Sequence, residues 1–184
     1  MSSDPEGCQI LADRPRVKAD ILPNLASLPP NTLGHQYAAF MTRNNISPDS
    51  RSEVRFVDDP DLAYVMTRYI LIITIIIIIV MTRYRETHDM THAILGQNTN
   101  MVGEVLVKWV EALQFRLPMC AGGAIFGPLR FKPKQRDQYN SLLPWALDQG
   151  LNAKFLLNVY YEKRWEQDID EFRKEFNITL APPS

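Results

Sequence analysis

The chain has 184 residues, enough for one domain with a hydrophobic core and too few for two domains of ordinary size. Its 20 Lys and Arg residues nearly balance its 21 Asp and Glu residues, and no basic cluster marks a nucleic-acid surface, so no nucleic-acid partner is expected. The two cysteines, Cys8 and Cys120, lie far apart, which argues against a CxxC zinc site and against a disulfide framework.

Residues 1–57 are rich in Pro, Asp and Asn. Because proline fixes φ and removes a backbone donor, we expect a largely irregular segment of extended connections and short helical pieces. The first residues are polar and acidic, whereas a mitochondrial presequence is rich in Arg and poor in acidic residues. We therefore interpret the chain either as cytosolic or as lacking its natural beginning.

A helical domain is predicted over residues 58–184. Asp59 can cap its first helix, and Pro60 suits the first helical position. The apolar run ILIITIIIIIV follows at 70–80; as a helix it would be about 16 Å long, about half of a ~30 Å hydrocarbon core. The string VMTRY occurs on both sides of this run, at 65–69 and 80–84. We therefore interpret residues 70–84 as an atypical Ile-rich insert rather than a membrane anchor.

Four further segments follow in the helical part of the chain. Residues 83–95 are predicted to form a helix ended by Gly96, and the apolar spacing from Val102 to Leu113 predicts a second. Residues 117–133 are apolar and interrupted by Gly and Pro. Helices are also predicted over 135–149, closed by Gly150, and over 161–176. No alternating strand pattern competes, so the predicted fold class is all-α, a single helical domain.

A candidate metal site lies in the first two of these helices. His88 and His92 are four residues apart, so both imidazoles project from one face of a helix. Asp89 lies about 100° round the helix, where it can be a ligand or can orient an imidazole. Glu104 begins the next helix, and antiparallel packing would bring its carboxylate over the histidines. Two nitrogens and two oxygens suit zinc, and also iron or manganese.

Other interpretations of these residues remain open. The two histidines can lie on a metal-free helix face, with Glu104 paired to Lys108 four residues on. The His88-Asp89 doublet also occurs in HD-type phosphohydrolases, for which His35 would have to supply the further upstream histidine. The zincin pattern HExxH is absent, as are a GxSxG elbow, a P-loop and a dinucleotide-binding fingerprint.

The signature HDxxHx₁₁E, formed by His88, Asp89, His92 and Glu104, resembles the zinc motif of a family in ubiquinone biosynthesis, that of the fourth Coq protein. The resemblance covers most of the chain. The strings that carry it are DPEGCQILADRPRV (4–17), SPDSRSEVRFVDD (47–59), RYRETHDMTH (83–92), NMVGEVLVKWVEALQFRLPMC (100–120), GAIFGPLR (123–130) and NVYYEKRWEQ (158–167).

The resemblance implies an all-α mitochondrial protein, peripheral on the matrix side of the inner membrane, within the multi-protein complex that makes ubiquinone. It implies a lyase activity, in which the C1 carboxylate is removed from a polyprenylated 4-hydroxy-3-methoxybenzoate. The four motif residues carry over as ligands of a zinc ion or another divalent ion. The alternative is a non-catalytic scaffold that organises the complex and binds prenyl lipid.

Residues 117–131 are the predicted groove for the polyprenyl tail. Basic residues beside the groove would suit the headgroups of anionic inner-membrane lipid. The alternative is an ordinary buried helix corner with a solvated basic end. The apolar residues are Leu117, Met119, Ile125, Phe126, Leu129 and Phe131, and the basic ones are Arg130, Lys132, Lys134 and Arg136.

Overall fold

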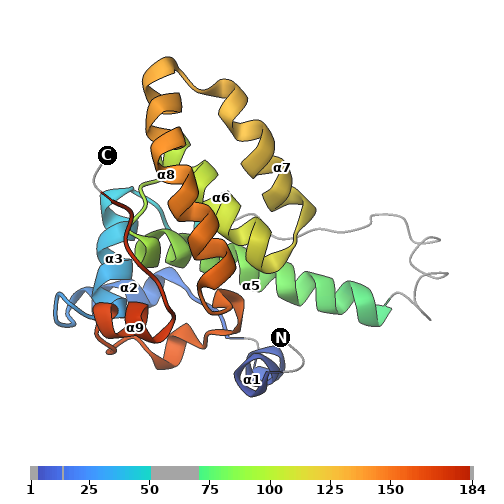
Figure 1. Ribbon diagram of the computed structural model, residues 1–184. Helices are drawn as coiled ribbons and strands as arrows, with labels where there is room; N and C mark the ends of the chain where they lie inside the picture. Colours follow the sequence, from blue (N-terminus) through green and yellow to red (C-terminus); the bar gives the residue numbers. More distant parts are fainter. Residues whose placement is uncertain (1–3, 14, 51–70, 183–184) are drawn as a thin grey trace.

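The computed structural model describes residues 4–13, 15–50 and 71–182, and every regular element in them is helical, which confirms the all-α prediction (Figure 1). The predicted helix start at 59–61 and the first VMTRY string lie outside the described residues. The α-helices are α1 (Pro5–Asp13), α2 (Leu22–Ala26), α3 (Leu33–Arg43), α5 (Leu71–Leu95), α6 (Met101–Phe115), α7 (Pro118–Phe126), α8 (Pro133–Asn152) and α9 (Ile169–Glu175). The 3₁₀ turns are η1 (Ala19–Ile21), η2 (Pro48–Ser50), η3 (Gly127–Arg130), η4 (Leu156–Asn158) and η5 (Tyr161–Lys163).

The N-terminal segment is more helical than its proline content predicts. Three of its six prolines occupy first-turn positions, where the missing N–H is tolerated: Pro5 begins α1, Pro23 lies in the first turn of α2 and Pro48 begins η2. The α3 helix contains no proline and is capped by Thr32, whose side chain accepts from the backbone N–H of His35. Its buried face enters the main core with Leu33, Tyr37 and Met41.

The α5 helix carries the Ile-rich run and the two candidate ligands in one continuous element of 25 residues. Its first turns project away from the other helices, while its last turns lie among them (Figure 1). Among the described residues, no helix combines the length and apolar character needed to cross a bilayer. Gly96, with φ of +65°, follows its last residue, in agreement with the predicted helix end.

The core is built around α6. This helix packs against α7 and α8, while α3 packs against α5 and α9. The α8 helix does not end at Gly150 as predicted but runs on to Asn152. Gly150 is needed for close packing instead, since a Cβ there would lie 2.6 Å from Cδ1 of Leu113 on α6.

The C-terminal apolar pattern is not one helix. The prediction of a helix over 161–176 is wrong, because η5 and α9 are separated by a connection at 164–168. Asp168 starts α9 by accepting hydrogen bonds from the backbone N–H groups of Asp170 and Glu171 at 2.8 and 3.0 Å. Tyr161 of η5 and Phe172 of α9 are both buried in the core, so the apolar residues of this pattern are contributed by two separate helical segments.

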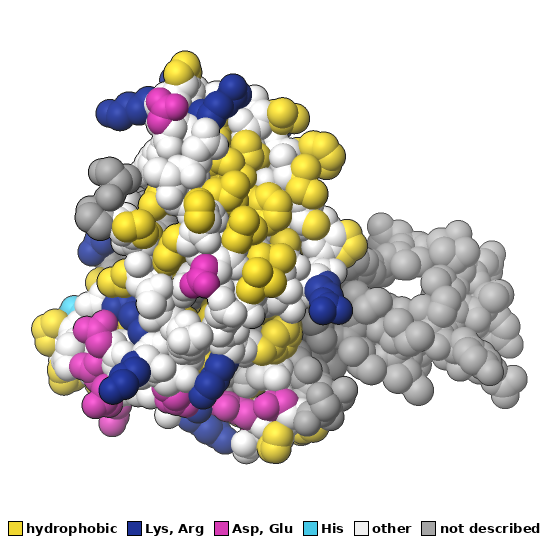
Figure 2. Space-filling model, in the orientation of Figure 1, with side chains coloured by type: hydrophobic (Ala, Val, Ile, Leu, Met, Phe, Trp, Pro, Cys, Tyr) yellow, Lys and Arg dark blue, Asp and Glu magenta, His cyan; other side chains and the backbone are white. Residues whose placement is uncertain are grey.

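Apolar side chains gather on the surface over α7 and α8 (Figure 2). Four exposed apolar residues of α7 and η3 form what we call the α7–η3 patch: Met119, Ile125, Phe126 and Leu129, with exposed fractions of 53, 56, 65 and 76%. The predicted groove is therefore smaller than expected. Phe131 is buried, and the centroid of its ring lies 5.3 Å from that of Tyr139, while Leu117 is half-buried.

Candidate metal centre

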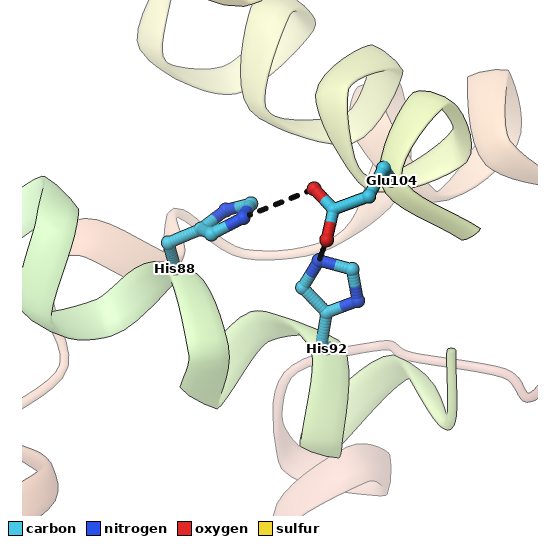
Figure 3. A group of neighbouring side chains, drawn as sticks. All are labelled: His88, His92 and Glu104. Atoms are coloured by element: carbon cyan, nitrogen blue, oxygen red, sulfur yellow. Dashed lines mark ion pairs between the residues drawn. The ribbon is translucent and has the colours of Figure 1, made fainter. Parts of the chain in front are cut away.

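Three of the four predicted ligands come together between α5 and α6. The imidazoles of His88 and His92 point from α5 toward the carboxylate of Glu104 on α6 (Figure 3). The Nε2 atom of His88 lies 3.5 Å from Oε2 of Glu104, and the Nε2 atom of His92 lies 3.4 Å from Oε1. One nitrogen or oxygen of each residue lies within 4.8 Å of the others, a spacing that could hold one cation.

The short connection between the two helices places Glu104. Gly96 reverses the chain with its positive φ, and Asn100 caps α6 by accepting from the backbone N–H of Gly103 at 2.9 Å. Gly103 has no room for a side chain, since a Cβ would lie 2.0 Å from the carbonyl oxygen of Asn98. The first turn of α6, with Glu104 in it, is thus held close to the last turns of α5.

Both histidines present the correct ring nitrogen for a metal ion. Nδ1 of His88 lies 2.6 Å from Oε1 of Glu111, and Nδ1 of His92 lies 3.3 Å from the carbonyl oxygen of Gln97. Because these acceptors take the Nδ1–H donors, the Nε2 atom of each ring faces Glu104 and offers its lone pair there when the ring is neutral. The Nε2 atom of His92 is fully buried and has no hydrogen-bond partner within the described part of the chain. Two imidazole nitrogens and a carboxylate fit a divalent ion such as zinc.

Electrostatics couple the three side chains. Burial by itself would lower the pKa of His88, but its contacts with Glu104 and Glu111 outweigh burial and raise the pKa to about 9. Burial would raise the pKa of Glu104, but the two imidazoles hold it well below its usual range. Glu104 is therefore an anion at neutral pH, and a proton on His88 competes with any cation for the same position.

Glu111 is a functional candidate that the sequence analysis missed. It is completely buried, accepts from Nζ of Lys108 at 2.8 Å and from the Tyr84 hydroxyl at 3.0 Å, and contacts His88. In the described structure Lys108 is paired with Glu111, three residues on, rather than with Glu104. The signal was present: Glu111 lies seven residues after Glu104, two turns along the same face of α6.

Asp89 and His35 are not part of the cluster of His88, His92 and Glu104. Asp89 is half-buried, lines a cavity beside His88 and is not one of the three clustered residues. The role of orienting His88, which the sequence offered to Asp89, is filled by Glu111. His35 lies on α3 with Nδ1 3.1 Å from the carbonyl oxygen of Ala26, so the cluster does not include the histidine that a phosphohydrolase site would need.

A family model matches the chain over residues 1–72 and 77–182, and its description is "Coenzyme Q (ubiquinone) biosynthesis protein Coq4". The chain belongs to the Coq4 family. This confirms the resemblance seen in the sequence. The interruption of the match, at residues 73–76, falls inside the predicted insert, whose bounds stay a prediction.

Several Coq4 relatives come from insects and are named "Ubiquinone biosynthesis protein COQ4 homolog, mitochondrial". The Aedes aegypti and Anopheles gambiae proteins are each 53% identical, over 98 and 100% of this chain and 61% of their own length. The Bombyx mori protein is 51% identical over 94% of this chain and 62% of its own length. The chain thus spans about three fifths of the length of the curated relatives that it matches.

The Coq4 fold also resembles a solved structure. The crystal structure of a candidate ubiquinone biosynthesis protein from Nostoc punctiforme superposes with a TM-score of 0.66, covering 95% of this chain and 75% of that one. Since the sequence identity is 21%, this likeness supports the fold alone.

Proposed function

We propose that the chain acts in ubiquinone biosynthesis as a metal-dependent lyase, removing the C1 carboxylate of a polyprenylated 4-hydroxy-3-methoxybenzoate. Family membership supports the pathway. The observation that carries the activity is the convergence of two imidazole Nε2 atoms and one carboxylate, with the buried Nε2 of His92 lacking a hydrogen-bond partner among the described residues. We propose zinc as the ion and Asp89 as its fourth ligand.

In this reaction the bond between ring carbon C1 and the carboxyl carbon breaks, CO₂ leaves, and C1 keeps the electron pair and takes up a proton. A divalent ion would supply Lewis-acid stabilisation of the developing negative charge. Nε2 of His88, Nε2 of His92 and the Glu104 carboxylate would hold the ion, and Glu111 would fix the ring of His88 through Nδ1. Burial of His92 and Glu111 keeps bulk water from this side of the cluster.

The test is CO₂ release by the purified chain from a carboxyl-labelled, prenylated 4-hydroxy-3-methoxybenzoate, together with metal content. We expect His88→Ala to lower both metal content and turnover, the latter by at least about 100-fold. The matched control is His35→Ala, which removes a histidine bonded to Ala26 and outside the cluster. Equal turnover in wild type and His88→Ala, with metal lost and assembly of the biosynthetic proteins retained, would refute the lyase and favour the scaffold.

We also propose that the chain is mitochondrial, bound peripherally to the matrix side of the inner membrane, beside the other ubiquinone-biosynthesis proteins. The insect relatives are named mitochondrial. The α7–η3 patch presents four exposed apolar side chains next to the exposed cations Arg130, Lys132, Lys134 and Arg136. Apolar surface bordered by cations suits an anionic lipid surface.

Liposome flotation tests this surface. Arg130→Glu with Lys132→Glu should weaken binding to vesicles containing anionic lipid and leave binding to neutral vesicles unchanged. Lys163→Glu with Lys174→Glu, which reverses the same charge elsewhere on the chain, is the control. If the two double variants float alike, the patch is not the lipid-binding surface.

A further inference from the structure

A cavity of about 300 Å³ opens beside the metal cluster, between α5, α6 and the start of α7. Four of its lining residues, at positions 84, 85, 88 and 89, form one face of α5. The cavity shares His88 with the cluster, so a molecule inside it would lie next to any ion held there. Its lining residues are Ile46, Tyr84, Arg85, His88, Asp89, Lys108 and Met119.

Arg85 is the cation of this wall that is available to a ligand. Lys108 already donates to Glu111 at 2.8 Å and to the Tyr84 hydroxyl at 2.6 Å, and Asp89 has a partner of its own. Arg85 is half-buried and forms no hydrogen bond or ion pair with any residue that the structure describes. It precedes His88 by three residues, so the two side chains are neighbours on the helix surface.

The cavity continues onto an apolar surface. Met119 lines the cavity and is also 53% exposed, and Phe126, seven residues later on the same face of α7, is 65% exposed. Between them, a Cβ at Gly123 would lie 3.2 Å from Cγ of Lys108, which shows how closely α7 approaches the cavity wall. A Cβ at Gly122 would meet nothing within 4 Å, so the surface of α7 is open at this position.

We propose that this cavity binds the head of an aromatic carboxylic acid with a long apolar tail, with Arg85 binding the carboxylate and the tail leaving past Met119 over Gly122. The guanidinium fork matches a carboxylate, and the apolar rim matches a tail. The proposal rests on the proposed function, because it names the cavity that presents such a substrate to the cluster. Arg85 is then a specificity-determining residue.

Isothermal titration calorimetry on the full chain tests the head site. The probes are geranylated 4-hydroxy-3-methoxybenzoate and its methyl ester, measured with the metal present and again after chelation. Wild type should bind the acid about tenfold more tightly than the ester, even after chelation, because the ester lacks the charge-assisted bond. Arg85→Gln should weaken binding of the acid and leave binding of the ester unchanged, and Arg85→Lys should recover part of the lost affinity. Lys174→Gln on the exposed face of α9 should change neither affinity.

The path of the tail over Gly122 has its own variant. Gly122→Leu adds a side chain in open space and improves helix propensity, so the chain should stay folded. This variant should bind the geranylated acid more weakly than wild type and should bind the unprenylated acid with unchanged affinity. Circular dichroism checks that each variant is folded.

Equal affinities of wild type for acid and ester, or equal weakening of both by Arg85→Gln, would overturn the head site. If Gly122→Leu changes the affinity for prenylated and unprenylated acids equally, the proposed path of the tail over Gly122 is overturned. Measuring CO₂ release separates these failures from failure of the lyase proposal. If the chain turns over substrate and Arg85→Gln leaves KM unchanged, the head site is overturned and the lyase activity stands. Tight, Arg85-dependent binding without turnover overturns the lyase alone.

Discussion

At the scale of single residues, the imidazole of His88 lies between two carboxylates with different surroundings. Glu104 is half-buried and faces both histidines, whereas Glu111 is fully buried and also holds Lys108 and Tyr84. The first carboxylate is placed to bind a cation, and the second fixes the ring that binds it.

Glu111→Gln should lower metal affinity without removing a ligand. The amide can no longer be a charged acceptor for the Nδ1–H of His88, so the ring loses orientation and basicity, and we expect zinc affinity to fall by about 10- to 100-fold. Competition with a fluorescent chelator measures the effect. Glu171→Gln, an exposed carboxylate on α9, is the control, and a Glu111→Gln affinity within error of wild type would contradict the role of Glu111.

The pKa of His88 predicts opposite pH effects with and without zinc. Its pKa rises from 6.5 to about 9, so in chelated protein the stabilising contribution of the charged ring is complete below about 6.5 and is lost as pH rises through about 9. Zinc must displace that proton, so its affinity should increase about tenfold per pH unit over the same range. Thermal unfolding scans should therefore show Tm falling with pH in chelator and rising in limiting zinc. If Tm changes with pH in the same direction in chelator and in limiting zinc, His88 is not a zinc ligand with a raised pKa.

At the scale of elements, the position of α5 depends on an ion pair at the turn before His88. Arg83 is 3% exposed; its guanidinium donates to the two carboxylate oxygens of Glu162 at 2.5 and 3.0 Å and to the carbonyl oxygen of Val159 at 2.9 Å. The bidentate contact ties α5 to η5, 79 positions along the chain, and the bond to Val159 ties it to the residue after η4, 76 positions along. Arg83 and Tyr84 belong to the second VMTRY string, so that copy forms buried contacts at the site.

Glu162→Ala should destabilise the fold by about 3–5 kcal/mol, because it leaves the guanidinium of Arg83 buried without its countercharge. Glu166→Ala removes an exposed carboxylate from the same region and should cost under about 0.5 kcal/mol. Denaturation with urea gives both free energies of unfolding. Similar values for the two variants would mean that water reaches Arg83 and that the pair contributes little.

At the scale of the whole molecule, the candidate metal centre joins two halves of the core. The α5 helix packs against α3, and α6 packs against α7 and α8, so an ion between α5 and α6 would couple both groups. The cavity and the α7–η3 patch lie on the α7 side of this junction, with Met119 in both.

Metal removal should therefore lower global stability. An ion that binds only the folded chain stabilises it by about 4 kcal/mol at a free concentration 1,000 times its Kd. Differential scanning calorimetry with zinc and with chelator should show this difference in wild type, and His88→Ala should abolish it. A zinc-dependent shift of equal size in His88→Ala would place the ion elsewhere.

The sequence by itself determined the helical class, the helix end at Gly96 and the shared face of His88 and His92, because these depend on local periodicity and on the φ preferences of single residues. It gave the wrong extent for two helices. Gly150 is required by packing against Leu113 rather than by a helix end, and the 161–176 pattern is divided between η5 and α9.

Only the tertiary structure decided which groups from different helices meet. Glu111 lies 23 residues from His88, and Met119 lies 34 residues from Arg85, yet each pair borders one site. Helix periodicity fixes the direction of a side chain relative to its own axis. Which other helix it faces depends on how the buried faces of α5, α6 and α7 pack together, and that packing is a property of the whole core.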